Sequence, residues 1–172
     1  MSLHNSNLDD LDLAILDAMH DYPRAGVLEL SRHTKVARAT VQSRIRRMEE
    51  SGVIAGYRPE IDIGAAGFDV QAYVTLEISQ GALDAVTADL NAIPGVLEAH
   101  ATTGSGDVLC RIGADSHRGL QEVLLQLDRS ASVVRSTSVI VLSTVVAPRT
   151  LPLLHTVTPV GGSKAPAYRH AD

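Results

Sequence analysis

The spacing of apolar residues changes near residue 60, and this change constrains the fold more than any other feature. Before it, apolar side chains recur at helical spacing, as at Leu11, Ile15 and Met19. After it they alternate, because the even positions of FDVQAYVTLEIS, residues 68–79, are apolar and most odd positions are polar. The first spacing is typical of amphipathic helices, and the second of a strand with one buried face. The sequence therefore predicts two domains of different structure.

Three short helices are predicted in the first part of the chain. The first begins near Asp9 and stops at DYPRAG, residues 21–26, and the second runs from Val27 to about His33. The third carries three apolar residues at helical spacing and ends at Gly52; these residues are Val41, Ile45 and Met48. A short helix, a tight turn and a third helix are typical of a helix-turn-helix. We expect this DNA-binding domain over residues 1–60, with an extended, wing-like end and a linker over 61–67.

Residues 68–147 predict the order β-α-β-β-α-β of a ferredoxin-like α+β domain. A strand at 68–79 precedes a helix with Leu83, Val86 and Leu90, and a β-hairpin, a second helix and a long strand, residues 133–146, follow. Two helices can cover only one face of four strands, so the other, partly apolar face predicts dimerisation. After Pro148 the chain has no clear periodicity, which predicts a loosely packed C-terminal extension over residues 148–172. The signals for it are Pro152, Pro159, Gly161, Gly162 and Pro166.

Composition excludes several classes of protein. No apolar run approaches the roughly 18 residues of a membrane span, and the start has no secretory signal, so we expect a cytoplasmic protein without a membrane partner. The single cysteine, Cys110, cannot support a disulfide framework and is expected to be a small buried residue. The net charge is −5, but basic residues are concentrated between Arg32 and Arg58. A local basic patch in an acidic chain is compatible with binding to DNA.

The polar face of the third predicted helix carries residue types that can contact double-stranded DNA. Gln42 suits base edges, Arg46 suits guanine or phosphate, and Thr40 and Ser43 suit phosphates. Arg38, near the start of the helix, can reach the DNA backbone. Charged outer faces of helices are usually only solvated, but the preceding short helix and tight turn favour DNA recognition here.

Residues 8–57 resemble the opening of the Lrp/AsnC family of prokaryotic transcription regulators. The similarity is carried by LDDLDLAILDAMHDYPRAGVLELSRHTKVARATVQSRIRRMEESGVIAGY and extends from about Leu8 to Val146. It implies a winged helix-turn-helix joined to a βαββαβ ligand-sensing domain, and dimers that assemble into octamers and often bind amino acids between dimers. RIRRMEESGVI matches the arginine-rich run of the family, which implies DNA contacts by Arg44, Arg46 and Arg47. Ala37 stands where the family usually has a serine N-cap.

The stretch TTGSGDVLCRI, residues 102–112, matches the G-x-x-D hairpin of the same family at Gly104 and Asp107. Ser136 and Ser138 stand where alternate threonines of the family face the effector. A glycine lets the backbone approach a small ligand, and a carboxylate such as Asp107 suits the ammonium group of an amino acid. The alternative is that Asp107 only caps the hairpin and the two serines only fill an edge strand.

Enzymatic motifs are missing from the sequence. GSGDVL lacks the third glycine of G-x-G-x-x-G, and Ser105 is not in a G-x-S-x-G context. The seven histidines lack the spacing of a zinc site, and His100 has no catalytic partner in the sequence. We therefore expect no enzyme, no cofactor and no metal. The prediction is an oligomeric regulator that binds DNA and senses a small effector, which the family resemblance implies is an amino acid. A ligand-independent architectural DNA-binding protein and a metabolite-binding module without DNA function remain the alternatives.

Overall fold

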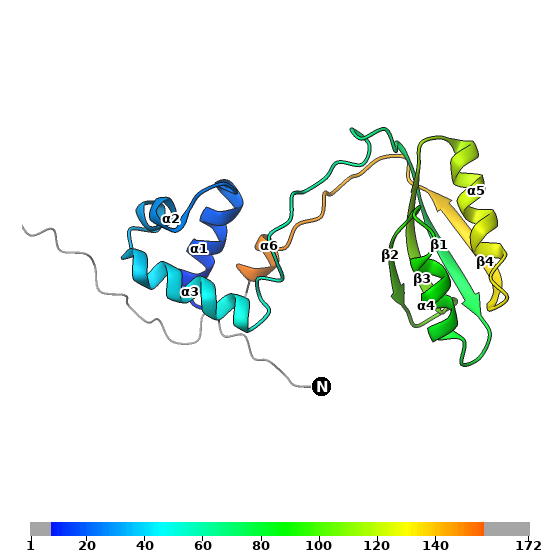
Figure 1. Cartoon of the computed structure of the whole chain (residues 1–172), viewed down its shortest axis with the longest axis horizontal. Coiled ribbons are helices and arrows are strands. Elements are labelled where there is room, and N and C mark those ends of the chain that lie inside the picture. Colours follow the sequence, from blue (N-terminus) through cyan, green and yellow to red (C-terminus); the bar gives the residue numbers. More distant parts are fainter. Residues whose placement is uncertain (1–7, 157–172) are drawn as a thin grey trace, which may run out of the picture. The chain divides into compact units, whose positions relative to one another are not determined.

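The computed structural model describes residues 8–156, which form two compact units (Figure 1). One unit contains residues 8–59 and 147–156, and the other contains residues 60–146. The chain thus leaves the first unit once and returns to it after the second unit is complete. Both units have a hydrophobic core of their own.

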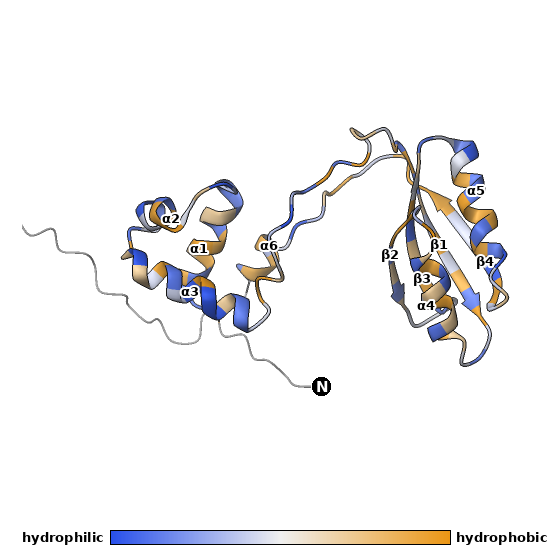
Figure 2. Ribbon diagram, in the orientation of Figure 1, coloured by the Kyte–Doolittle hydropathy of each residue, from blue (hydrophilic) through white to orange (hydrophobic). Residues whose placement is uncertain are grey.

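Helices make up the first unit: α1 (Asp10–Asp21), α2 (Val27–Thr34), α3 (Arg38–Glu50) and the short α6 (Leu151–Leu154). The three helices predicted in this region are confirmed. The three apolar residues predicted to face inward from α3 are buried, and they pack with Leu13, Ile15 and Leu30 of α1 and α2. In Figure 2 the rest of α3 is largely blue, that is, hydrophilic. The core therefore fixes one side of α3 and leaves a polar side outward.

Local signals set the ends of these helices. Asp9 caps α1 through a reciprocal pair of hydrogen bonds with Asp12, and α2 ends at Lys35, which is in the left-handed region at φ 55°. Ala37 precedes α3 and makes no side-chain cap, and Gly52 follows it at φ 75°. Positive φ favours glycine, so Gly52 ends the third helix as predicted.

The second unit has the order β1 (Val70–Ile78), α4 (Leu83–Asn91), β2 (Val96–Ala101), β3 (Val108–Ala114), α5 (His117–Asp128) and β4 (Val133–Ile140). The strands form one antiparallel sheet in the order β2-β3-β1-β4. This confirms the βαββαβ prediction. Ala72, Val74 and Leu76 of β1 are fully buried, in one core with residues of α4 and α5. The intervening residue Tyr73 is exposed, as is its partner Val139 on β4.

The last strand is shorter than the sequence predicts. Its expected range reached Val146, but β4 ends at Ile140, and residues 141–146 form no strand. The reason lies in its partner: Ile140 pairs with Ala72 near the start of β1, so the sheet has almost no neighbouring backbone beyond it. Apolar residues in this segment, such as Leu142 and Val145, are exposed instead.

Within the predicted C-terminal extension, residues 151–154 form the short helix α6, in which no side chain is fully buried. Helix α6 lies against α1, Leu154 packs on the core of the first unit, and His155 Nε2 lies 2.9 Å from Asp17 Oδ1. Pro152 is compatible with this helix because it stands in its first turn, where a backbone N–H has no helical partner. The other predicted signals, Pro159, Gly161, Gly162 and Pro166, lie outside the described residues.

Candidate DNA-binding surface and effector site

The outward side of α3 presents most of the side chains predicted to contact DNA. Thr40 is half-buried, and Arg44 points toward α1 with its side chain 18% exposed. The other five predicted residues are exposed: Arg38, Gln42, Ser43, Arg46 and Arg47. Their exposure follows from the helical period, since the three buried residues of α3 fix the opposite side. The helix therefore offers an amide, a hydroxyl and three guanidinium groups to a partner.

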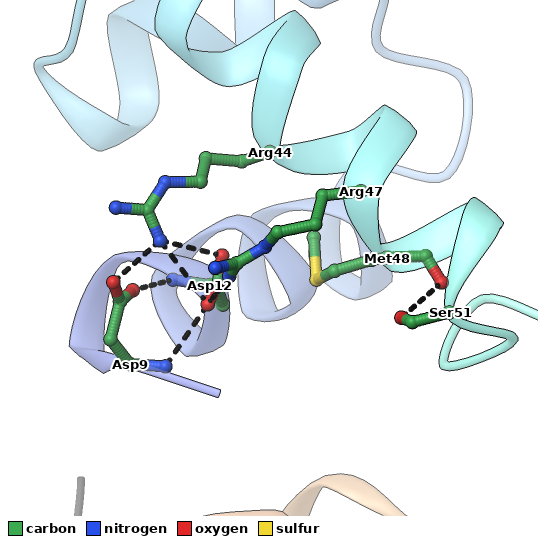
Figure 3. A network of polar contacts seen from close by, with 6 residues as sticks. All are labelled: Asp9, Asp12, Arg44, Arg47, Met48 and Ser51. Atoms are coloured by element: carbon green, nitrogen blue, oxygen red, sulfur yellow. Dashed lines mark hydrogen bonds and ion pairs between the residues drawn. The ribbon is translucent and has the colours of Figure 1, made fainter. Parts of the chain in front are cut away.

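Arg44 and Arg47 bind the acidic start of α1 (Figure 3). Nη1 of Arg44 donates hydrogen bonds to Asp9 Oδ2 at 2.5 Å and to Asp12 Oδ1 at 3.2 Å. Nη2 of Arg47 donates to Asp12 Oδ2. Asp12 is fully buried, whereas the side chain of Arg47 is 51% exposed. We call Asp9, Asp12, Arg44 and Arg47 the anchor cluster, because they join the start of α1 to the middle of α3.

The anchor cluster changes the proton affinities of two of its members. Burial raises the pKa of the Asp9 carboxyl, but hydrogen bonds from Arg44 and from the backbone of Asp12 outweigh it, so this pKa lies below its ordinary value. Burial lowers the pKa of Arg44, but the hydrogen bond to Asp9 and the charge of Asp12 raise it above its ordinary value. Both directions favour the charged forms, which is the condition for a persistent ion pair.

Two further contacts involve the end of α3. Arg46 Nε donates to Glu50 Oε1 at 2.8 Å on the exposed side of the helix. The hydroxyl of Tyr57, in the segment after α3, donates to Glu49 Oε1 at 2.6 Å. Partial burial of the hydroxyl and this hydrogen bond raise the pKa of Tyr57 to about 12, so the phenol stays protonated and remains a donor.

The sequence alone does not reveal the roles of Asp9, Asp12 and Tyr57. One signal for Asp12 was present, because it stands at helical spacing with Ile15 and Met19 on the apolar side of α1. A charged residue at such a position requires a buried partner. The identity of that partner was not visible, since Arg44 and Arg47 follow 32 and 35 positions later.

Gly104 and Asp107 lie in the hairpin between β2 and β3. Gly104 has φ 122°, which favours glycine, and the backbone N–H of Asp107 donates to Leu76 O. Oδ2 of Asp107 accepts a hydrogen bond of 2.8 Å from the backbone N–H of Ile78. Oδ2 of Asp107 thus strengthens the contact between the hairpin and β1, whereas Oδ1 does not take part in this hydrogen bond.

Ser136 and Ser138 lie on β4 opposite Leu76 and Val74 of β1. Opposite residues of an antiparallel pair share a face, so both serines belong to the helix-covered face of the sheet. The hydroxyl of Ser136 donates to Asp128 Oδ1, at the end of α5, at 2.7 Å. Asp107, which directly precedes β3, and Ser136, on β4, lie on the two sides of the end of β1, and Ser138 lies two residues further along β4.

A surface cavity of about 340 Å³ lies elsewhere, between α4 and β2. Its lining includes Leu83, Leu90, Asn91, Leu97 and His100, and it contains none of the four residues predicted to bind an effector. Within the described residues, the predicted effector residues therefore do not line this cavity.

Other candidate chemistry is not supported in the described residues. Within residues 8–156, no group of three or more His, Cys, Asp or Glu side chains could hold a metal ion. No helix in this part of the chain is long and apolar enough to cross a membrane. Cys110 is fully buried, as predicted, and burial raises the pKa of its thiol to about 11, so the reactive thiolate is suppressed.

Comparison with known proteins gives similarities over both units. Residues 8–55 match a model described as winged helix-turn-helix DNA-binding, and residues 71–151 match the Lrp/AsnC ligand binding domain. The HTH-type transcriptional regulator Rv2324 of Mycobacterium tuberculosis is 34% identical over 140 residues, which cover 81% of this chain and 95% of that protein. The regulatory protein AsnC of Escherichia coli is 28% identical over 141 residues, or 81% and 92% of the two chains.

Solved structures agree with these matches. The structure of E. coli AsnC aligns with a TM-score of 0.79 at 26% identity and covers 84% of this chain and 99% of AsnC. A feast or famine regulatory protein from M. tuberculosis, complexed with L-methionine, aligns with a TM-score of 0.74 at 29% identity, with coverages of 83% and 97%. The similarity therefore includes both units and their order along the chain.

Proposed function

This chain belongs to the Lrp/AsnC family of transcription regulators, and we propose that it binds specific double-stranded DNA through α3 and senses an amino acid through its second unit. Its relatives are named as transcriptional regulators, and regulation of transcription does not require catalysis. The observation that carries the DNA part is the outward side of α3, where Gln42, Ser43 and Arg46 are exposed together. A helix held by a core on one side and polar on the other is the form in which a helix-turn-helix enters the major groove.

Each side chain on this side of α3 has a role that its chemistry supports. Gln42 can make a bidentate contact with adenine, and Arg46 with guanine or a phosphate. Ser43, Thr40 and Arg38 can bind the DNA backbone and fix the register of the helix. Glu50 neutralises part of the charge of Arg46 in the free protein, but this pair is exposed and can exchange with phosphate.

We predict that Arg46→Ala weakens DNA binding and makes it less dependent on salt. Loss of one phosphate contact lowers the slope of log K against log salt concentration by about 0.9, since fewer counterions are released. The slope is measured by fluorescence anisotropy with a labelled DNA duplex over a salt series. Arg118→Ala is the matched control, because Arg118 forms the same i,i+4 pair with Glu122 on the exposed side of α5. An unchanged slope in Arg46→Ala would remove Arg46 from the DNA-binding surface.

The effector part of the proposal rests on the end of the sheet where Asp107 and Ser136 flank β1. The free oxygen of Asp107 can accept hydrogen bonds from an ammonium group, and Gly104 leaves space beside it: a Cβ built there meets nothing within 4 Å. The L-methionine complex of the similar M. tuberculosis protein supports an amino acid as the ligand class. Ser138 is proposed to lie at the edge of the effector site, because it is two residues further along β4 than Ser136.

A panel of the standard amino acids is expected to include at least one that stabilises the second unit. A ligand at 100 times its Kd adds about 2.7 kcal/mol, which raises the melting temperature by several degrees for a domain of this size. Thermal unfolding is measured with each amino acid at millimolar concentration. Asp107→Asn keeps an acceptor for the Ile78 N–H but removes the charge, so it should abolish the shift, whereas the exposed Asp84→Asn should keep it. No shift with any amino acid would refute this effector class.

Assembly through the uncovered face of the sheet is part of the proposal. The side chains of Tyr73 and Val139 are 42% and 66% exposed on neighbouring strands, and an exposed apolar face of this kind is typical of an interface. We propose a homodimer through this face and further assembly to an octamer, in which a bound amino acid changes the spacing of the DNA-binding units. An architectural DNA-binding protein would assemble in the same way but would not respond to amino acids.

A further inference from the structure

The anchor cluster holds two of the predicted DNA-contacting arginines in a charge-balanced arrangement. Asp9 and Asp12 supply two negative charges, and Arg44 and Arg47 supply two positive charges, so the formal charge of the cluster is zero. Asp12 is its centre, because its carboxylate accepts hydrogen bonds from both arginines and from the backbone N–H of Asp9 (Figure 3). The positive charge that α3 offers to DNA is therefore smaller than its four arginines suggest.

The two exposed arginines of α3 that form ion pairs differ in the environment of their partners. Arg46 is paired with Glu50, whose side chain is 64% exposed, so water can solvate Glu50 when Arg46 turns to a phosphate. Arg47 is paired with Asp12, which is 0% exposed. If Arg47 turns away, the buried carboxylate loses one of its two guanidinium partners and gains no water in exchange. A phosphate must compete with Asp12 for Arg47, but only with a solvated carboxylate for Arg46.

We propose that Asp12 is a specificity-determining residue that restrains Arg47 from non-specific binding to DNA phosphates. The inference rests on the proposed DNA-binding function. Non-specific binding comes from phosphate attraction alone, and in such complexes any mobile guanidinium can follow the DNA backbone. At a cognate sequence, base contacts fix the position of α3. A mobile Arg47 therefore adds less to the affinity for cognate DNA than to the affinity for non-specific DNA. Asp12 therefore lowers non-specific affinity more than specific affinity.

The test compares Asp12→Asn with Asp10→Asn, which removes the same charge from the exposed side of the same turn of α1. Affinity is measured for a random-sequence duplex over a salt series, and for a duplex selected by the wild-type protein, at a temperature where circular dichroism shows every variant folded. In Asp12→Asn the salt slope for the random duplex should become steeper by about 0.9, the value for one released guanidinium. The ratio of selected to random affinity should fall several-fold. Asp10→Asn should leave both quantities near their wild-type values.

The double variant Asp12→Asn with Arg47→Gln should bring the slope back to the wild-type value or below it, because the released charge is gone. A purely structural role of Asp12 would lower the melting temperature and leave the slope unchanged, and a shallower slope would mean that Asp12 presents Arg47 to DNA; both results would overturn the proposal. If Asp12→Asn does not fold, Arg47→Gln is compared with Arg46→Gln, and an equal loss of slope in the two is the contradicting result. A wild-type protein without salt-dependent binding to either duplex would instead refute the proposed function.

Discussion

The Arg44→Ala variant should lose about 3 kcal/mol of the free energy of unfolding of the first unit. This value is the low end of the range for removing one partner of a buried ion pair, because Arg47 still faces Asp12 when Arg44 is gone. The loss arises because the buried carboxylate of Asp12 is left with fewer hydrogen bonds. The contact between α1 and α3 is then weaker. Hydrogen exchange of the α1 and α3 amides, followed in a urea series, measures it for this unit alone.

Arg46→Ala serves as the control for this prediction. It removes an arginine from the same helix, but the pair with Glu50 is exposed and is worth about 0.3–0.5 kcal/mol. The two variants should therefore separate stability from DNA contact, since Arg44→Ala acts mainly on unfolding and Arg46→Ala mainly on binding. Equal and small losses in both would show that the anchor cluster does not stabilise the unit.

Gly106→Ala is expected to destabilise the second unit by about 1–3 kcal/mol, the usual effect of overpacking. A Cβ at this position would lie 2.1 Å from Thr75 Cγ2 and 3.4 Å from Leu76 O, so the hairpin would have to move away from β1. The movement would also disturb the hydrogen bond from Ile78 to Asp107 and the proposed amino-acid site. The two measurements are the melting temperature of the variant and the change of that temperature when an amino acid is added.

A second substitution tests the cause of that loss. Thr75→Ser removes the methyl group that the new Cβ would meet, so it should recover much of the stability of Gly106→Ala while costing little by itself. If the double variant is no more stable than Gly106→Ala, the effect comes from backbone freedom at residue 106 and not from the contact with Thr75.

Local patterns were sufficient to predict most of the elements. The spacing of Val41, Ile45 and Met48 predicted which side of α3 is buried, and alternation along residues 70–78 predicted the buried side of β1. Both patterns repeat within one element and depend only on its geometry. The exposed side of α3 followed from the same reasoning, because it lies opposite the buried side.

Features that depend on distant residues could not be predicted. The contact of Arg44 with α1 is one example, because its partners Asp9 and Asp12 lie more than 30 positions earlier in the chain. The length of β4 depends on where β1 begins, and the docking of Leu154 depends on the return of the chain to the first unit. The direction of Ser136 depends on its register with Leu76. Register and chain return are tertiary properties that periodicity does not encode.

Sequence-specific recognition of DNA by α3 is the central element of the proposed function. The most direct measurement is the affinity of the full chain for a duplex enriched from a random library, compared with a scrambled duplex at physiological salt. We expect an affinity ratio of at least about 10³, and a large reduction of this ratio in Gln42→Ala, whose side chain is proposed to contact a base. Equal affinity for the two duplexes would exclude sequence-specific recognition by α3 and would indicate an architectural DNA-binding protein.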